Sequence, residues 1–385
     1  MCQRFRLATQ VSSAIRALVT RQLRIHADRI PYEFDRLPIA KVLNACRVEA
    51  STYFKPSRPW GWPTHLMVEP STLCNLTCAL CPVTAGLARP QGLMEFSMFK
   101  KVIDEVGQYI FTLLLWDWGE PFTNPAVYSM IDLAARRGIK TISSTNGVPF
   151  ARKDTADRAI QAGLDTLIVA VDGITQESYA RYRQGGKLES ALDGIRMIVA
   201  RKKALGSTKP LINFRFIVMR HNEHEVPRLS EFARSLGVNA LTLKTLNPSS
   251  QDMYAARDEM LKNESYLPQD RRYWRFRTDA LGRRIRRKHN PCKHPWYHPS
   301  IHWNGVVCSC TYDSQERYPL GDLRQKSFHE IWLDNPYRQL RTQFRRAWNK
   351  LPLCRECSYA YEGGDCTSET IAEAIFYPEA PSRRP

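Results

Sequence analysis

The sequence has no long apolar run, and this absence argues against a membrane-spanning helix. Its longest strongly apolar stretch covers residues 109–115, far short of the roughly 18 residues that a span requires, and it is typical of a buried strand. The amino terminus also lacks a secretory signal, so we expect a cytoplasmic protein. With 385 residues, 43% of them apolar, the chain is long enough for a barrel and an added small domain.

Acidic residues are scarce, because only 38 stand against 56 lysines and arginines, for a net charge of +18. This excess attracts anions such as nucleotides, sugar phosphates, acidic lipids or nucleic acid, without choosing among them. Residues 1–27 contain five arginines and no acidic residue, and apolar residues recur at helical spacing at positions 11, 15, 18, 19 and 23. We predict a basic amphipathic helix that docks on the protein's own core; peripheral membrane contact and a transit peptide are alternatives.

The first group of cysteines lacks a fourth member. Cys74, Cys78 and Cys81 have the spacing Cys-x3-Cys-x2-Cys, and the next cysteine is Cys292. Three thiolates can hold a four-iron cluster and leave one iron open to a small molecule, whereas clusters used only for electron transfer usually have four protein ligands. Structural zinc sites also need four ligands, so the triplet fits zinc poorly. A low-potential cluster further indicates a reducing compartment.

A second group of cysteines lies near the carboxyl terminus. Cys292 and Cys310, together with the close pair Cys354 and Cys357, supply four thiolates. Four thiolates can ligate an iron–sulfur cluster completely or hold a structural zinc ion, and the spacing alone leaves both open. Of the other cysteines nearby, we interpret Cys308 and Cys366 as spare thiols, with a role as alternate ligands the second possibility.

Between residues 64 and 246, strand and helix patterns alternate. The predicted strands are His65–Glu69, Tyr109–Trp118, Lys140–Ser144, Thr166–Val171, Ile212–Met219 and Ala240–Leu246. Helix patterns lie between them near 96–107, 124–137, 151–162, 188–204 and 223–236. Such alternation predicts a parallel sheet with helices outside, either doubly wound or an open partial barrel.

The remaining segments complete the predicted organisation. Residues 1–63 form the amino-terminal extension and linker, 64–246 the core, 247–291 a basic linker, 292–366 a small cysteine-rich domain and 367–385 a tail. Between Arg271 and Lys293, ten residues are basic and only Asp279 is acidic, a net charge of +9. This segment is either a solvated face or an anion-binding rim over the site.

The triplet, placed after a predicted strand, resembles the cluster motif of radical S-adenosylmethionine (SAM) enzymes. The resemblance implies an α/β fold with a partial (β/α)6 TIM barrel, and a 4Fe-4S cluster whose open iron is chelated by SAM. The segment Gly119-Glu120-Pro121 looks like the family's Gly-Gly-Glu-Pro motif, which holds the SAM amino group, with Trp118 in place of the first glycine. Further residues that the resemblance places at the cofactor are Asn146, Asp172 and Arg183, the last of which could pair with the SAM carboxylate.

The second cysteine group resembles the SPASM extension of the same family. Trp296, residues 301–307, Gly321-Asp322 and Ile331-Trp332 carry this likeness, which implies an auxiliary 4Fe-4S cluster held by Cys292, Cys310, Cys354 and Cys357. The second cysteine block is shorter than that of a full SPASM domain. One auxiliary cluster is therefore expected, as in the "twitch" version found in aminocyclitol dehydrogenases.

The resemblance implies a reaction as well. SAM would be cleaved reductively to a 5′-deoxyadenosyl radical, which abstracts hydrogen from an unactivated carbon. An auxiliary cluster as electron acceptor favours a net oxidation. The positive charge of the chain favours an anionic sugar or other small molecule as the substrate, with peptide modification as the alternative. Asp313, three residues after Cys310, is a candidate proton acceptor by position, or else a turn residue. A flavodoxin- or ferredoxin-type donor would supply electrons; a non-catalytic nucleic-acid-binding protein is the distant alternative.

Overall fold

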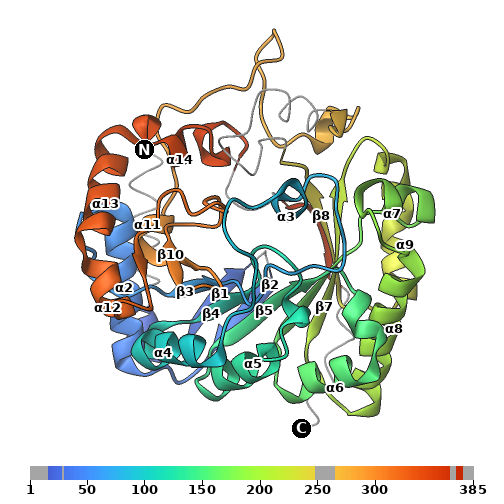
Figure 1. The fold of residues 1–385 in the computed structure, drawn as a ribbon, viewed down its shortest axis with the longest axis horizontal. Coiled ribbons are helices and arrows are strands. Elements are labelled where there is room, and N and C mark those ends of the chain that lie inside the picture. Colours follow the sequence, from blue (N-terminus) through green and yellow to red (C-terminus); the bar gives the residue numbers. More distant parts are fainter. Residues whose placement is uncertain (1–15, 28–29, 248–264, 365–369, 376–385) are drawn as a thin grey trace.

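Six parallel strands form the centre of the molecule (Figure 1). The computed structural model describes residues 16–27, 30–247 and 265–364, and the backbone of 370–375. The strands are β3 (His65–Val68), β4 (Thr112–Leu115), β5 (Lys140–Thr145), β6 (Thr166–Ala170), β7 (Leu211–Val218) and β8 (Ala240–Thr245). They pair in sequence order, each parallel to the next. This topology confirms the predicted partial barrel.

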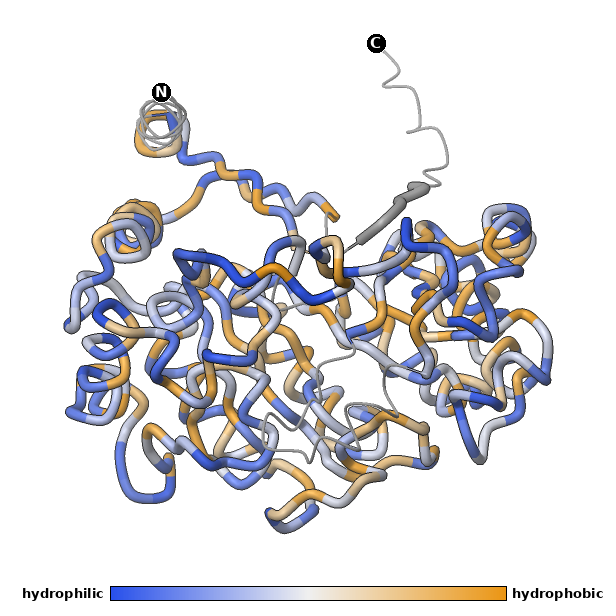
Figure 2. Tube along the Cα trace, turned by 90° about the horizontal axis from the view of Figure 1, so that it is seen from above, coloured by the Kyte–Doolittle hydropathy of each residue, from blue (hydrophilic) through white to orange (hydrophobic). Residues whose placement is uncertain are grey.

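Helices cover the outer face of these strands, in an arc that is visible in Figure 1. They are α4 (Phe96–Val106), α5 (Val127–Arg136), α6 (Lys153–Gln161), α7 (Gln176–Tyr182), α8 (Leu188–Ala204) and α9 (Leu229–Ser235). Alternate strand residues such as Leu113 and Leu115, or Phe214 and Phe216, belong to the main apolar core. Successive side chains of a strand point to opposite faces, so one set contacts the helices and the other faces the barrel interior. In Figure 2, hydrophobic and hydrophilic residues alternate within the peripheral helices.

The amino-terminal residues pack against the barrel strands. Strands β1 (Leu23–Ala27) and β2 (Ile30–Phe34) form an antiparallel hairpin, and helix α2 (Ile39–Phe54) follows. Tyr32 in β2 lies within hydrogen-bond distance of Thr166 in β6, at 2.7 Å between hydroxyl oxygens. Apolar residues of the hairpin share a core cluster with Ile142 and Ile168.

The predicted amino-terminal helix is partly wrong. Residues 16–20 are helical and Ala17 is buried in the hairpin's core cluster, which agrees with intramolecular docking. Leu23, however, begins a strand, because Arg21 has a φ of 56° that ends the helix; residues 1–15 lie outside the described part. Among the described residues, no helix has the length and apolar character needed to cross a membrane.

The cysteine-rich region extends the barrel sheet. Strand β9 (Ser300–Ile301) pairs in parallel with β3, and β10 (Val306–Cys308) and β11 (Gly321–Asp322) continue the sheet. Its helices are α11 (His294–Tyr297), α12 (Phe328–Leu333), α13 (Asn335–Ala347) and α14 (Pro352–Arg355). Within the predicted tail, β12 (Thr370–Ile375) pairs antiparallel with β8. The small domain therefore lies directly beside the first strand of the core.

Candidate functional site

The cysteine triplet lies in the loop between β3 and the short helix α3 (Pro82–Ala85). Backbone N–H groups of Thr77 and Ala79 donate to the carbonyls of Gln184 and Tyr182, each at 3.0 Å, and tie this loop to the end of α7. Burial raises the pKa of the Cys74 thiol to about 11, with Cys78 and Cys81 adding to the shift. A bound metal stabilises the thiolate form of its cysteine ligands, so three closely spaced cysteines fit a cluster.

The segment after β4 packs against the triplet loop. Gly119 has a φ of 82°, and a Cβ there would lie 2.5 Å from the carbonyl oxygen of Ser71. The N–H of Glu120 donates to the carbonyl of Leu73 at 2.8 Å, one residue before the first cysteine. Only glycine permits this approach. Pro121 then begins a 3-10 turn, Pro121–Thr123.

The carboxylate of Glu120 is buried and joins two strand ends. It accepts hydrogen bonds from the N–H of Asn146 at 2.8 Å and from the Thr145 hydroxyl at 2.9 Å. Burial raises the pKa of Glu120 to about 7, although these hydrogen bonds and Arg183 oppose the shift. A carboxylate of this kind can ionise when a cation is placed beside it.

Asn146 reaches the triplet loop directly. Its side-chain amide donates to the Asn75 side-chain oxygen at 2.7 Å and lies 4.0 Å from Cys74 Sγ. The amide oxygen accepts from the N–H of Val148, which fixes the orientation of the side chain.

Asp172 and Arg183 form a buried ion pair rather than a surface one. The Arg183 Nη2 lies 2.6 Å from Asp172 Oδ2, with the Asp172 side chain fully buried. The other Arg183 nitrogen, Nη1, lies 3.6 Å from Cys78 Sγ. Asp172 is itself held by the N–H of Ile217 at 2.8 Å. Asp172 thereby positions the guanidinium beside the triplet.

The four cysteines of the second group converge from three segments. Burial raises the pKa of the Cys292 and Cys310 thiols far above the usual value, and neighbouring Cys354 and Cys357 thiols add to the effect. Such mutual influence requires the thiols to be close together. In the described part of the chain, no three His, Cys, Asp or Glu side chains are arranged around a single metal ion. The donor chemistry, four thiols of which one is buried and three are partly buried, fits a fully ligated cluster.

Asp313 lies in the turn that follows Cys310. Its side-chain oxygens accept hydrogen bonds from the N–H groups of Arg317 and Tyr318, both at 2.9 Å. Cys308, in β10, is buried close to Asp313, whose charge contributes to raising the pKa of the thiol after the larger effect of burial. Cys366 lies outside the described residues.

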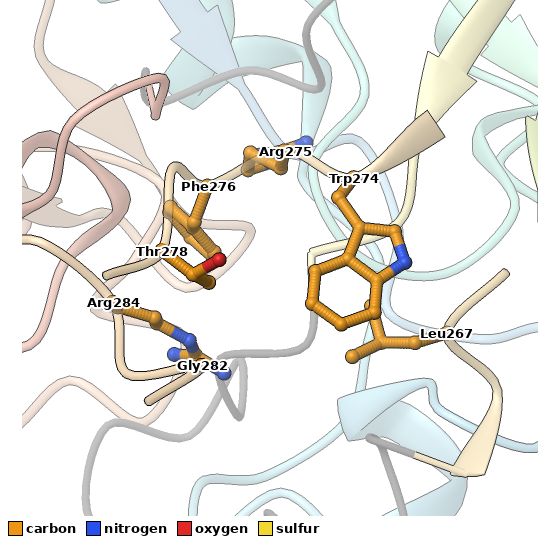
Figure 3. A pocket seen from close by; sticks show the side chains of 7 residues that line it. All are labelled: Leu267, Trp274, Arg275, Phe276, Thr278, Gly282 and Arg284. Carbon is orange, nitrogen blue, oxygen red and sulfur yellow. The ribbon is translucent and has the colours of Figure 1, made fainter. Parts of the chain in front are cut away.

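The basic linker folds over the barrel mouth beside β8. Buried Arg275 donates to the carbonyl of Thr245 at 3.1 Å and to the Ser358 hydroxyl at 3.3 Å, so it bridges core and small domain. A pocket of about 120 Å³ lies next to it (Figure 3). Its lining residues are Leu267, Trp274, Arg275, Phe276, Thr278, Gly282 and Arg284. Aromatic walls with guanidinium groups suit an anion that carries an apolar part.

Several residues near the triplet were not predicted. Asn75 takes part only through a contact made in three dimensions, and no spacing in the sequence marks it. The indole nitrogen of Trp118 is buried without a hydrogen-bond partner in the described structure. The signal available in the sequence was the position of Trp118, which stands next to Gly119 where the family motif has a glycine.

Comparison with known proteins gives two family matches. Residues 68–233 match the family described as "Radical SAM superfamily". Residues 292–358 match "Iron-sulfur cluster-binding domain", the SPASM family. Both matches fall where the sequence motifs placed the core and the cysteine-rich domain.

Individual relatives are distant. The chain is 23% identical over 327 residues to a tungsten-containing aldehyde ferredoxin oxidoreductase cofactor-modifying protein of Pyrococcus furiosus, covering 76% of this chain and 87% of that protein. It is 27% identical over 194 residues to an AdoMet-dependent heme synthase of Methanosarcina barkeri, covering 49% of this chain and 52% of that protein. Among solved structures, Streptococcus suis SuiB bound to precursor peptide SuiA aligns with a TM-score of 0.55 at 13% identity, covering 92% and 83%. This last likeness supports the fold.

Proposed function

We propose that this chain catalyses a net oxidation of an anionic small molecule. The proposal starts from its family, because the chain belongs to the radical SAM superfamily and carries a SPASM domain. The radical SAM domain binds a 4Fe-4S cluster and SAM, and the SPASM domain binds auxiliary iron–sulfur clusters. When bound, the first cluster and SAM supply a 5′-deoxyadenosyl radical that abstracts hydrogen from an unactivated carbon. The protein's part is to orient these groups and to exclude water.

Residues around the triplet have separable roles in this proposal. Cys74, Cys78 and Cys81 would ligate the cluster. Gly119 and Glu120, which contact the triplet loop, would receive the SAM amino group, with Pro121 fixing the turn and Asn146 holding the Glu120 carboxylate. Arg183, oriented by Asp172, would pair with the SAM carboxylate.

The observation that carries net oxidation is the second set of thiols. The thiols of Cys292, Cys310, Cys354 and Cys357 influence one another's pKa, and they are buried or partly buried, so a cluster there would have all its ligands from the protein. A cluster with no open iron suits electron transfer rather than substrate binding. It could therefore accept the electron that the substrate loses. Asp313 stays a candidate for the accompanying proton, although both of its side-chain oxygens already accept backbone hydrogen bonds.

The linker favours an anionic substrate, such as a sugar with an acidic group. The basic side chains near Arg275 and the pocket beside it lie at the carboxyl end of β8, the end of a parallel barrel where substrates bind.

Peptide modification is the second candidate, favoured by the fold-level likeness to SuiB, which was solved with a precursor peptide. Radical SAM enzymes need an electron donor, for which we infer a flavodoxin- or ferredoxin-type protein. A cytoplasmic location, with peripheral membrane contact through residues 1–27, stays a prediction.

The function is tested by anaerobic reconstitution followed by assays for metal and for SAM cleavage with dithionite. We expect about eight irons per chain, which corresponds to two four-iron clusters, and 5′-deoxyadenosine as a product. A substrate deuterated at the reacting carbon should pass deuterium to 5′-deoxyadenosine. About four irons with one zinc would remove the electron-accepting role of the second site. A loaded cluster that yields no 5′-deoxyadenosine would contradict the whole proposal.

The raised pKa of Glu120 predicts that SAM binding depends on pH. Because its pKa is about 7 in the folded protein, the carboxyl group is mostly protonated at pH 5.5 and mostly anionic at pH 7.5. An anion is needed opposite a SAM ammonium group, so affinity should rise by roughly tenfold over this range. In Glu120→Gln, affinity should be weak and nearly independent of pH. Calorimetry on reconstituted protein measures this, with Glu189→Gln on the exposed face of α8 as control. A flat wild-type profile would remove Glu120 from the SAM site.

A further inference from the structure

Buried charged side chains connect the core to the small domain, and the proposed function does not use them. This charge network consists of Glu69, Arg89, Asp117, His302 and Glu316. Glu69 and Asp117 follow β3 and β4, whereas His302 and Glu316 belong to the small domain. The side chains of Glu69, Arg89, Asp117 and His302 are at most 3% exposed.

One half of the network is a tight ion pair. Arg89 donates to both side-chain oxygens of Glu69, at 2.9 and 2.6 Å. Its Nε donates to the carbonyl of Ser314 at 2.6 Å, and Glu69 also accepts the N–H of Trp303 at 3.1 Å. Both contacts reach the small domain. The domains are thus joined by groups that would be costly to leave unpaired.

The other half of the network is centred on one carboxylate, that of Asp117, which lies between the two candidate cofactor sites. Asp117 immediately precedes Trp118 and Gly119, and so begins the segment that packs on the triplet loop. It accepts the Ser300 hydroxyl at 2.7 Å and also the Thr311 hydroxyl. Thr311 directly follows Cys310. The side chain of Asp117 therefore contacts the residue next to Cys310, while its backbone leads into the segment that packs on the triplet loop.

The network also contains two groups, Asp117 and His302, whose affinity for protons is raised. Three carboxylates face one guanidinium, which leaves two negative charges to be balanced in a buried place. Burial raises the pKa of Asp117 to about 6. Burial alone would lower the pKa of His302. The charge of Glu69 and a hydrogen bond with Glu316 at 2.9 Å outweigh burial, so the pKa of His302 is raised. His302 Nε2 lies 3.8 Å from Asp117 Oδ2 and has no hydrogen-bond partner in the described structure.

We propose that Asp117 is a positioning residue that fixes the Cys310–Thr311 loop against the segment that follows β4, and that its protonation, shared with His302, sets the charge beside the auxiliary cluster. The second part rests on the proposed function, because it assigns Cys310 to that cluster; the first part does not. The other ionisable groups around the pair are Glu69, Arg89, Glu316 and the Cys308 thiol. A negative charge near a cluster lowers its reduction potential, and hydrogen bonds near its ligands also tune it.

The first test uses iron-free protein and amide hydrogen exchange over residues 303–318. Asp117→Asn and Thr311→Val each weaken the contact between Asp117 and the loop, so exchange there should become roughly tenfold faster or more. The matched controls are Asp132→Asn, an exposed carboxylate on α5, and Thr342→Val, an exposed hydroxyl on α13. Unchanged exchange in both test variants would overturn the positioning role. Thr311→Val keeps the test valid if Asp117→Asn fails to fold.

The second test measures the auxiliary cluster alone, in a background where Cys74, Cys78 and Cys81 are alanine. Its midpoint potential should fall as pH rises through the Asp117 pKa of about 6, because proton loss adds negative charge. In Asp117→Asn the potential should be more positive at pH 8 and depend less on pH. Equal pH dependence in both proteins would overturn the protonation role. A zinc-loaded site would instead remove the electron-accepting role that the proposed function gives to the second site, while the exchange test still decides the positioning role.

Discussion

Replacing Cys74, Cys78 and Cys81 together with alanine is expected to lower the rate of 5′-deoxyadenosine formation by at least about a thousandfold. This corresponds to about 4 kcal/mol or more in activation free energy. The expectation follows from the donor set. Without the three thiols the first cluster would lose its protein ligands, and SAM would lose the iron that it chelates in this family. The iron content should fall from about eight to about four per chain, since the second thiol group is untouched.

The fold should tolerate this change. The loop is held mainly by backbone hydrogen bonds, from Thr77 to Gln184 and from Ala79 to Tyr182, which do not involve the thiols. The buried pair of Asp172 and Arg183 also remains. Circular dichroism and thermal unfolding should therefore be close to those of the wild type. Cys46→Ala, a thiol on α2, is the control and should keep both clusters. If the triple variant still forms 5′-deoxyadenosine, catalysis does not take place at the triplet.

The sequence signals for this first site are local. Three cysteines within eight residues define a donor set regardless of the fold, and a strand end gives Gly119 and Glu120 their place. The six core strands were also predictable, because strands buried on both faces read as short apolar runs between helical patterns. Boundaries were less accurate: β4 is Thr112–Leu115, whereas the apolar run suggested Tyr109–Trp118. The run extends before β4 because Ile110 and Phe111 are buried as well, whereas Trp116 and Trp118 after the strand are only partly buried.

What the sequence could not predict depends on contacts between distant segments. Glu69 and Trp303 are 234 positions apart yet joined by a hydrogen bond, and β9 lies beside β3 because the small domain returns to the first core strand. Charged residues such as Arg89 carry no mark of burial in the sequence, since an isolated arginine is usually exposed. The hairpin of β1 and β2 was missed for a different reason. Its apolar residues fit a helical period as well as an alternating one, and the φ of Arg21 decides between them.

Replacing Cys310 with alanine is expected to separate SAM cleavage from substrate oxidation. The triplet site lies on other elements and should continue to form 5′-deoxyadenosine at close to the wild-type rate, within about threefold. Oxidised product should fall by at least about a hundredfold, because the substrate would lose its electron acceptor after hydrogen abstraction. Iron content should fall to about four per chain. The measurement is the ratio of oxidised product to 5′-deoxyadenosine, in a single anaerobic reaction with an accepted substrate.

Cys308 provides a matched control for this variant. Cys308 is buried and lies two residues before Cys310 in the chain. Apart from burial, the pKa of its thiol is influenced mainly by Asp313, Glu316 and Asp117 rather than by the other cysteines. The Cys310 thiol, in contrast, is influenced by Cys357, Cys292 and Cys354. Cys308→Ala should therefore retain about eight irons and a normal product ratio. If Cys308→Ala loses the cluster and Cys310→Ala keeps it, the ligand assignment must be exchanged between them. If both variants oxidise substrate normally, the second thiol group has no part in accepting electrons.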